Sequence, residues 1–254
     1  MERNYSYLEL DYKINSHYIN TNKKLGLYGL LGILQDVAGE HALRLGFGYE
    51  DSKKKGFFWV LVRQKLRINR WPDWNDLVTI KTWTKDIIGI YAIREYEIFV
   101  NDQKIGDCST TWMILDSQTR RPKKIDNLDN LFKPRLEKTL EYNAQKVSIP
   151  KEIDSERRLK VQISDLDMNN HVSNIKYAEW ILNLIPFSYH KEYVIKEYEI
   201  NFSNEILLGE KIELFSNMKN ISPSNNSELF FKGDRVEDSK TVFAARLIAE
   251  KLNI

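Results

Sequence analysis

Residues 159–182 read LKVQISDLDMNNHVSNIKYAEWIL, and two periodicities in this stretch decide the fold. Up to Ile163, apolar and polar residues alternate, which is typical of a half-buried strand. From about Asn170 the apolar residues recur at helical spacing, and Pro186 ends the predicted helix. The sequence therefore predicts a strand that passes through a polar loop into an amphipathic helix.

The same pattern stands in the first half of the chain, where residues 8–14 alternate and a helix is predicted over 27–45. Further strands are predicted at 57–69, 77–85, 90–101 and 104–116, and in the second half at 198–202, 210–217, 227–236 and 240–250. The last segment is also compatible with a helix. Because a long helix must bury its apolar face on the strands that follow, each half is predicted to be an α+β unit and the chain a fused pseudo-dimer.

Composition excludes several classes of protein. The 254 residues, 42% of them hydrophobic, suffice for one large domain or two small ones. With Lys+Arg 38 against Asp+Glu 36, no overall basic field points to nucleic acid. No apolar run reaches the ~20 residues that a membrane-spanning helix needs. The first five residues lack the pattern of a secretory signal, so we expect a cytoplasmic protein. Its one cysteine, Cys108, excludes an internal disulfide and a Cys-rich zinc site.

The predicted domain organisation is an N-terminal unit over residues 1–125, a connector over 126–156 and a C-terminal unit over 157–254. The connector is rich in Lys, Glu, Asn and Asp, which favours a surface segment, with a short helix around 128–141.

The polar loop before the second helix carries the candidate chemistry. Asp167, Asn169 and His171 alternate, so in an extended loop they face one way, with a helix N-terminus behind them. An amide donor, an imidazole and a carboxylate can together activate water and stabilise a tetrahedral intermediate. The alternative is that Asp and Asn merely cap the helix.

Comparison of the two halves favours a site over a simple cap. Aligned without gaps, Tyr18 takes the place of Asp167 and Asn22 that of His171, whereas Asn20 matches Asn169. A duplicated unit in which one copy lost its site would produce this asymmetry. We therefore expect one site, in the second half.

Several separated motifs resemble one known family. Residues 165–182, DLDMNNHVSNIKYAEWIL, are similar to the signature of the acyl-acyl carrier protein (acyl-ACP) thioesterases, which include the plant plastid enzymes and bacterial relatives. The first half resembles the same family at WVLVR (59–63), RWPDWND (70–76), TWMILD (111–116) and TRRP (119–122). The resemblance extends from about Tyr7 to Leu214.

This resemblance implies two tandem hotdog units and hydrolysis of the thioester between a fatty acyl chain and the phosphopantetheine of acyl carrier protein, without metal or cofactor. The family's catalytic Asp, Asn and His fall on Asp167, Asn169 and His171. Its catalytic glutamate, on the strand after the second helix, best matches Glu205.

One position departs from the plant pattern. Many plant members carry cysteine after the glutamate, but this chain has Ile206, which argues against a Cys-His mechanism. Either Glu205 or His171 would activate water, Asn169 and a helix N–H would hold the oxyanion, and Asp167 would orient the loop.

The expected partners are acyl carrier protein, which is acidic, and the fatty acyl chain; a homodimer is compatible with the sequence. The basic clusters at 53–55, 120–124 and 157–158 are candidates for steering the carrier, or are simply solvated. Acyl-CoA hydrolysis and a non-catalytic acyl-thioester binding module are the alternatives. A hotdog dehydratase is disfavoured because its His and Phe-Pro-Gly-His-Pro pattern does not occur.

Overall fold

The chain folds into two compact units in the computed structural model, Met1–Ala144 (unit 1) and Gln145–Ile254 (unit 2). The structure describes residues 7–124, 140–220 and 226–252. The predicted helix around 128–141 falls almost wholly outside these residues, and 140–141 are not helical. The expected boundaries at 125 and 157 stay predictions.

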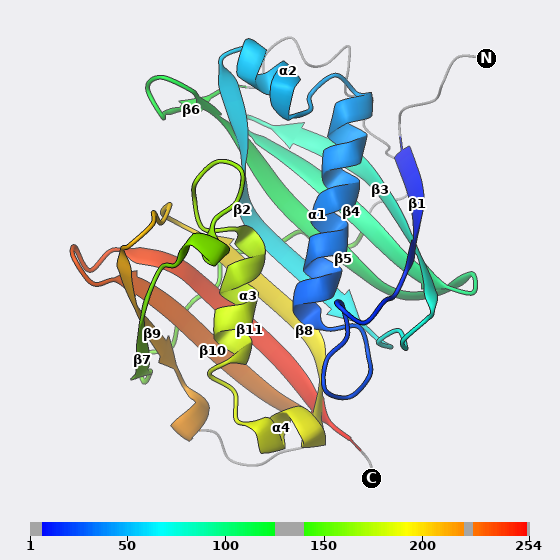
Figure 1. Cartoon of the computed structure of the whole chain (residues 1–254), viewed down its shortest axis with the longest axis vertical. Coiled ribbons are helices and arrows are strands. Elements are labelled where there is room, and N and C mark those ends of the chain that lie inside the picture. The colour runs from blue at the N-terminus through cyan, green and yellow to red at the C-terminus, as the bar shows by residue number, and fades with distance from the viewer. Residues whose placement is uncertain (1–6, 125–139, 221–225, 253–254) are drawn as a thin grey trace. The chain divides into compact units, whose positions relative to one another are not determined.

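Unit 1 is an antiparallel sheet with one long helix between its first and second strands in the sequence (Figure 1). Its described elements are β1 (Tyr7–Lys13), α1 (Leu27–Arg44), α2 (Tyr49–Lys54), β2 (Phe57–Ile68), β3 (Leu77–Ile88), β4 (Tyr91–Val100), β5 (Gln103–Asp116) and β6 (Pro122–Lys123). The strands lie in the order β1-β3-β4-β5-β2, and β6 pairs with β5. Asn101 and Asp102 close the β4–β5 hairpin, both with positive φ (50° and 60°), as a two-residue turn of this type requires.

Unit 2 repeats this architecture. Its described elements are β7 (Asp154–Lys160), α3 (Asn174–Leu182), α4 (Phe187–Glu192), β8 (Tyr193–Phe202), β9 (Lys211–Ser216), β10 (Asn226–Arg235) and β11 (Thr241–Lys251), with 3-10 turns at Ile163–Asp165 and Met218–Asn220. The strand order β7-β9-β10-β11-β8 reproduces that of unit 1, element for element. The duplication predicted from the sequence is therefore confirmed by the topology of the two sheets.

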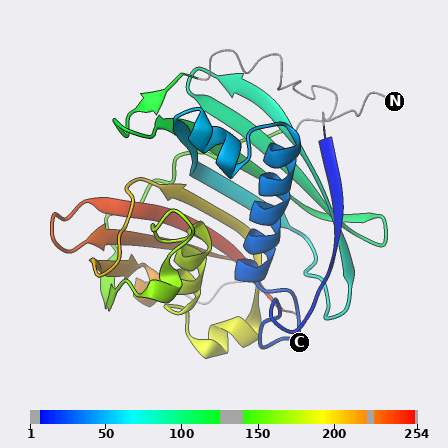
Figure 2. The same ribbon diagram turned by 45° about the horizontal axis from the view of Figure 1, so that its top comes forward.

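In each unit the helix buries its apolar face against the sheet (Figures 1 and 2). The buried side of α1 includes Leu30, Leu34 and Val37, which are at most 1% exposed. In α3, the Tyr177 ring packs edge-on against Phe202 of β8 and Phe243 of β11, at centroid distances of 5.2 and 5.4 Å. Edge-to-face aromatic pairs of this kind fix the helix on its sheet.

Most predicted elements are present, with four differences. The strand predicted up to Ile163 ends at Lys160, and Ile163–Asp165 form a 3-10 turn in which Ile163 is 74% exposed. The second helix begins at Asn174 rather than near Asn170, because the N–H of Ser173 donates to the Asp165 carbonyl (2.8 Å) and keeps the preceding residues in the loop. Residues 241–251 form strand β11, which resolves the ambiguity there. The six-residue helices α2 and α4 were not expected from the sequence, since such short helices show little periodicity.

At two glycines of the α1 region, substitution by alanine is expected to change the free energy of unfolding in opposite directions. Gly46, just after α1, has φ +73°, and its N–H and that of Phe47 bond back to the carbonyls of Leu43 and Ala42 (3.0 and 2.8 Å). Gly39 lies inside α1, and an added Cβ there would meet nothing within 4 Å. We expect Gly46→Ala to lower the free energy of unfolding by about 1 kcal/mol and Gly39→Ala to raise it by about 0.5–1 kcal/mol. Urea unfolding with an unchanged m value measures both; shifts of the same sign would contradict the assignment.

Candidate active site

Two loops of unit 2 carry the predicted site residues. One runs from β7 to α3 and holds Asp167, Asn169 and His171; the other joins β8 to β9 and holds Glu205. The N–H of Val172 donates to the carbonyl of Ile206 (3.0 Å) and ties the loops together. His171 and Glu205 directly precede these two residues, and His171 Nε2 lies 3.7 Å from Glu205 Oε2. The structure thus brings together an imidazole and a carboxylate that are 34 positions apart in the sequence.

Asp167 organises its own loop. Its Oδ1 accepts the N–H of Asn169 (2.8 Å) and that of His171 (3.4 Å), and its own N–H donates to the His171 carbonyl (2.8 Å). Asn170, between them, takes a positive φ of 62°, a conformation that asparagine tolerates better than most residues. Oδ1 of this carboxylate is therefore occupied by backbone donors.

The site is partly open to water. The side chains of His171 and Glu205 are 20% and 37% exposed, and Asn169 is exposed. Beneath the loops lies Tyr177, which is buried; burial raises the pKa of its phenol, and the Glu205 and Asp167 carboxylates raise it further. The phenol is therefore protonated at neutral pH.

Unit 1 contains the same pair of loops. Their hydrogen bonds show that the gapless alignment of the two halves is wrong by two residues. Leu25 N–H donates to Pro72 O (2.8 Å) as Val172 does to Ile206, and Asn20 Oδ1 accepts the N–H groups of Asn22 and Lys24 (2.9 and 3.3 Å) as Asp167 does in unit 2. Asn20 therefore corresponds to Asp167 rather than to Asn169, a slip of two residues. The slip was invisible in the sequence because an alternating strand pattern looks the same when shifted by two.

In the corrected register the two units differ at the reactive positions. Asn22 matches Asn169, but Lys24 stands at the position of His171 and forms an ion pair with Asp73 (2.5 Å). Trp71, which precedes Pro72 and is 8% exposed, stands at the position of Glu205. Unit 1 therefore keeps the loop geometry but lacks both the imidazole and the carboxylate.

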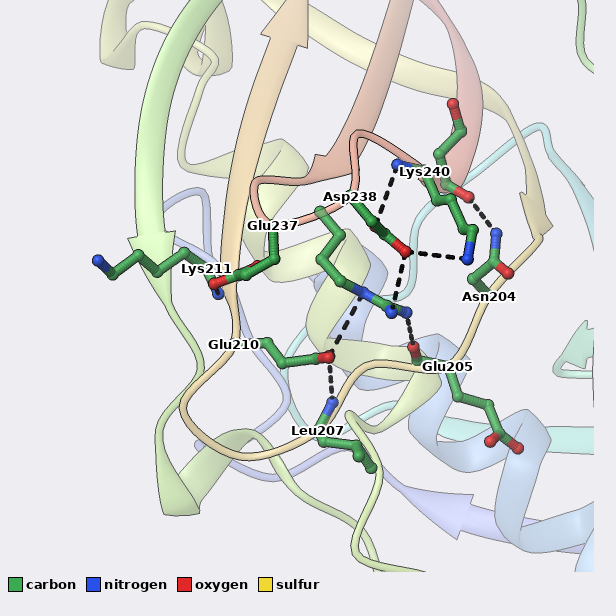
Figure 3. Close-up of polar contacts among 10 residues, drawn as sticks. Asn204, Glu205, Leu207, Glu210, Lys211, Glu237, Asp238 and Lys240 are labelled. Atoms are coloured by element: carbon green, nitrogen blue, oxygen red, sulfur yellow. Dashed lines mark hydrogen bonds and ion pairs between the residues drawn. The ribbon is translucent and has the colours of Figure 1, made fainter.

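Sequence reasoning missed Arg235, at the end of β10. Its Nη2 donates to the main-chain carbonyl of Glu205 (2.7 Å), and its other nitrogens lie 3.5 Å from the carboxylates of Glu210 and Asp238. Figure 3 shows the Glu205 side chain directed away from these two carboxylates. No motif marks this arginine, because only the β9–β10 register brings residue 235 to the loop at 205.

The cysteine lies in the other unit. Cys108 of β5 is fully buried, accepts a hydrogen bond from Gln64 Nε2 (3.7 Å), and has a thiol pKa raised by burial. Within the described ranges, no group of three or more His, Cys, Asp or Glu side chains is arranged to hold a metal ion. No helix in those ranges is long and apolar enough to cross a bilayer.

The loop geometry predicts that an asparagine side chain can take the structural role of Asp167, as Asn20 does in unit 1. Either side-chain oxygen accepts the two N–H groups, so we expect Asp167→Asn to keep the free energy of unfolding within about 0.5 kcal/mol, whereas Asp167→Ala loses about 1 kcal/mol. Hydrogen exchange at the amides of Asn169 and His171 should accelerate only in the alanine variant. Asn20→Ala is the matched control and should release the amides of Asn22 and Lys24. Equal protection in Asp167→Ala and wild type would refute this role.

Comparison with known proteins agrees with this architecture. Residues 6–131 match the family model described as acyl-ACP thioesterase N-terminal domain, and residues 148–245 match the C-terminal domain. The structure of an acyl-ACP thioesterase from Bacteroides thetaiotaomicron covers 96% of this chain with a TM-score of 0.81 at 22% identity, and 98% of that chain is covered. The 12:0-ACP thioesterase from Umbellularia californica covers 97% with a TM-score of 0.81 at 18% identity, again with 98% of that chain covered. Both show the same tandem hotdog fold.

Among curated relatives, the oleoyl-acyl carrier protein thioesterase of Coriandrum sativum is 30% identical over 192 residues, 68% of this chain and 52% of that protein. The oleoyl-acyl carrier protein thioesterase 2 of Arabidopsis thaliana is 28% identical over 224 residues, 81% of this chain and 61% of that protein. The chain thus spans about half to three-fifths of the length of these plant proteins. From both domain models and the shared fold we conclude that the chain belongs to the acyl-ACP thioesterase family.

Proposed function

We propose that this protein hydrolyses the thioester of fatty acyl-ACP, releasing free fatty acid and the carrier protein. The observation that supports this most is the juxtaposition of His171 and Glu205, 3.7 Å apart on two partly exposed loops, in a member of this family. Unit 1 has the same loops without these two groups, so the proposal assigns the reaction to unit 2 alone.

In the proposed mechanism, water attacks the acyl carbon while the His171–Glu205 pair takes its proton. If His171 takes the proton, the Glu205 carboxylate stabilises the imidazolium that forms; if Glu205 takes it, the carboxylate becomes a neutral acid beside His171. The side chain of Asn169 and a main-chain N–H of the loop or helix start donate to the oxyanion of the tetrahedral intermediate. Collapse of the intermediate breaks the carbon–sulfur bond, and the leaving thiolate takes up the proton. Asp167 holds the loop through its backbone bonds and takes no proton.

Substitution of the three reactive side chains tests this assignment. We expect His171→Ala, Glu205→Gln and Asn169→Ala each to lower kcat for acyl-ACP hydrolysis, by about 10²–10³-fold for loss of the oxyanion donor. The matched controls are Lys24→Ala and Asn22→Ala at the equivalent positions of unit 1, which should retain full kcat. Acyl thioesters that bind wild type but survive intact would favour a binding module. Full activity in all three folded variants would exclude the proposed site.

The carrier protein, being acidic, needs a basic surface, and two of the sequence clusters come together in unit 1. Phe57, which follows the lysines at 53–55, pairs with Asp116 across β2 and β5, and the Ser117 N–H donates to the Gly56 carbonyl (3.0 Å). Arg120 lies over the Phe58 ring, 4.7 Å from its centroid. We call this set the basic surface; its exposed members are Lys53, Lys54, Lys55, Arg120, Arg121, Lys123 and Lys124. We propose it as the site that steers acyl carrier protein, because clustered like charge focuses an oppositely charged partner.

The third cluster provides the control. Arg158 is bound by both carboxylate oxygens of Glu213 (3.2 and 3.1 Å), which offsets its charge. We expect the double variant Lys54→Glu/Arg121→Glu to raise KM for acyl-ACP about tenfold or more and to reduce its salt dependence, with little change for acyl-CoA. Arg158→Gln, which removes this already offset charge, should leave KM for acyl-ACP within about twofold. If KM for acyl-ACP changed with neither salt concentration nor charge reversal, this would count against the docking surface.

A cytoplasmic location and a homodimer stay predictions.

A further inference from the structure

We propose that Arg235 is a positioning residue for the reaction, because it holds the main chain at Glu205 and so aims the Glu205 carboxylate at His171. This inference rests on the proposed function of Glu205. The guanidinium donates to the main-chain carbonyl of Glu205, so it fixes the position of the backbone from which the Glu205 side chain extends.

The contacts of Arg235 suit this task. A charge-assisted bond of 2.7 Å to a carbonyl is a strong, directional restraint. Glu210 and Asp238 hold the guanidinium from two further directions, at 3.5 Å each. Glu210 in turn accepts the Leu207 N–H (2.8 Å), so the same carboxylate ties the arginine to the second half of the loop. The β8–β9 loop is thereby tied to Arg235 at Glu205 and, through Glu210, at Leu207 (Figure 3).

Unit 1 shows that this anchor is not needed to form the loop. Val78 pairs with Val100 in unit 1 as Ile212 pairs with Arg235 in unit 2, so Val100, 2% exposed, stands at the arginine position. The loop of unit 1 nevertheless makes the equivalent bonds, with Asp73 N–H donating to Asp76 Oδ2 (3.0 Å). The chain therefore carries an arginine at this place only where the loop presents Glu205 rather than Trp71.

Removal of the side chain should reduce turnover more than binding. A carboxylate displaced by about 1 Å loses up to about 10²-fold in rate, so we expect Arg235→Met to lower kcat for acyl-ACP about 10- to 100-fold with KM changed less than about twofold. Arg235→Lys keeps the charge but not the planar fork and should be intermediate. The matched control is Arg246→Met: Arg246 is 27% exposed, and in the part of the chain that the structure describes its ion pairs are with Glu197, Glu199 and Glu228 of the same sheet. It should retain wild-type kcat.

A double-mutant cycle separates positioning from a general loss of structure. If Arg235 acts through Glu205, then Arg235→Met/Glu205→Gln should be no slower than Glu205→Gln alone, whereas independent defects would multiply. Should Arg235→Met fail to fold, the cycle is run with Arg235→Lys.

The outcomes are distinguishable. An active wild type, an inactive Glu205→Gln and a fully active, folded Arg235→Met would overturn this inference alone, as would losses that multiply in the double variant. A fully active Glu205→Gln would overturn both the role of Glu205 and its positioning by Arg235. A wild type that cleaves no acyl thioester would overturn the proposed function and this inference with it.

Discussion

The hydrogen bond from the Val172 N–H to the Ile206 carbonyl is the constraint on which the candidate site depends. It joins the loop before α3 to the loop before β9, and the residues immediately preceding its two ends are His171 and Glu205. Because both ends are main-chain groups, the bond sets the relative position of the two loops whatever side chains they carry. The corresponding bond in unit 1, from Leu25 to Pro72, holds the same two loops with Lys24 and Trp71 in those places.

The two units therefore separate the scaffold from the chemistry. Features shared by both belong to the scaffold: the strand order, the side-chain oxygen of Asn20 or Asp167 that accepts two N–H groups, and a positive φ at Lys23 or Asn170 (59° and 62°). Features confined to unit 2 are His171, Glu205 and the arginine behind them. Asp167 falls in the first group, so its closeness to the reactive groups is better explained by loop geometry than by proton transfer.

Much of this fold could be predicted from the sequence, because long alternating or helical patterns such as 77–88 and 27–44 reflect one buried face. The proximity of Glu205 to His171 came from family resemblance, since nothing in either segment encodes the other. Two features could not be predicted from the sequence: the register between the two units and the contacts of Arg235. The register between the units was misjudged by two residues, because Ile163 continues an alternation that in fact ends at Lys160 and is itself 74% exposed. Arg235 was missed because its partners are set by strand pairing across 30 positions.

The ion-pair cluster next to Glu205, formed by Arg235, Glu210 and Asp238, is difficult to explain as a contribution to the stability of the fold. Unit 1 fills the corresponding positions with Val100 and Trp71, 2% and 8% exposed, and the ion pairs of its loop, Lys24 with Asp73 and Arg70 with Asp76, involve more exposed basic side chains. Unit 2 instead confines an arginine, 20% exposed, between two carboxylates. Replacing partly buried ion pairs by packed apolar groups is often neutral or stabilising, so stability alone does not account for the charged cluster of unit 2. Sites built for reaction commonly depart from the most stable arrangement, and the departure here is confined to the unit that carries the imidazole and the carboxylate. The ion-pair cluster is therefore better understood as support for Glu205 than as part of the folding core.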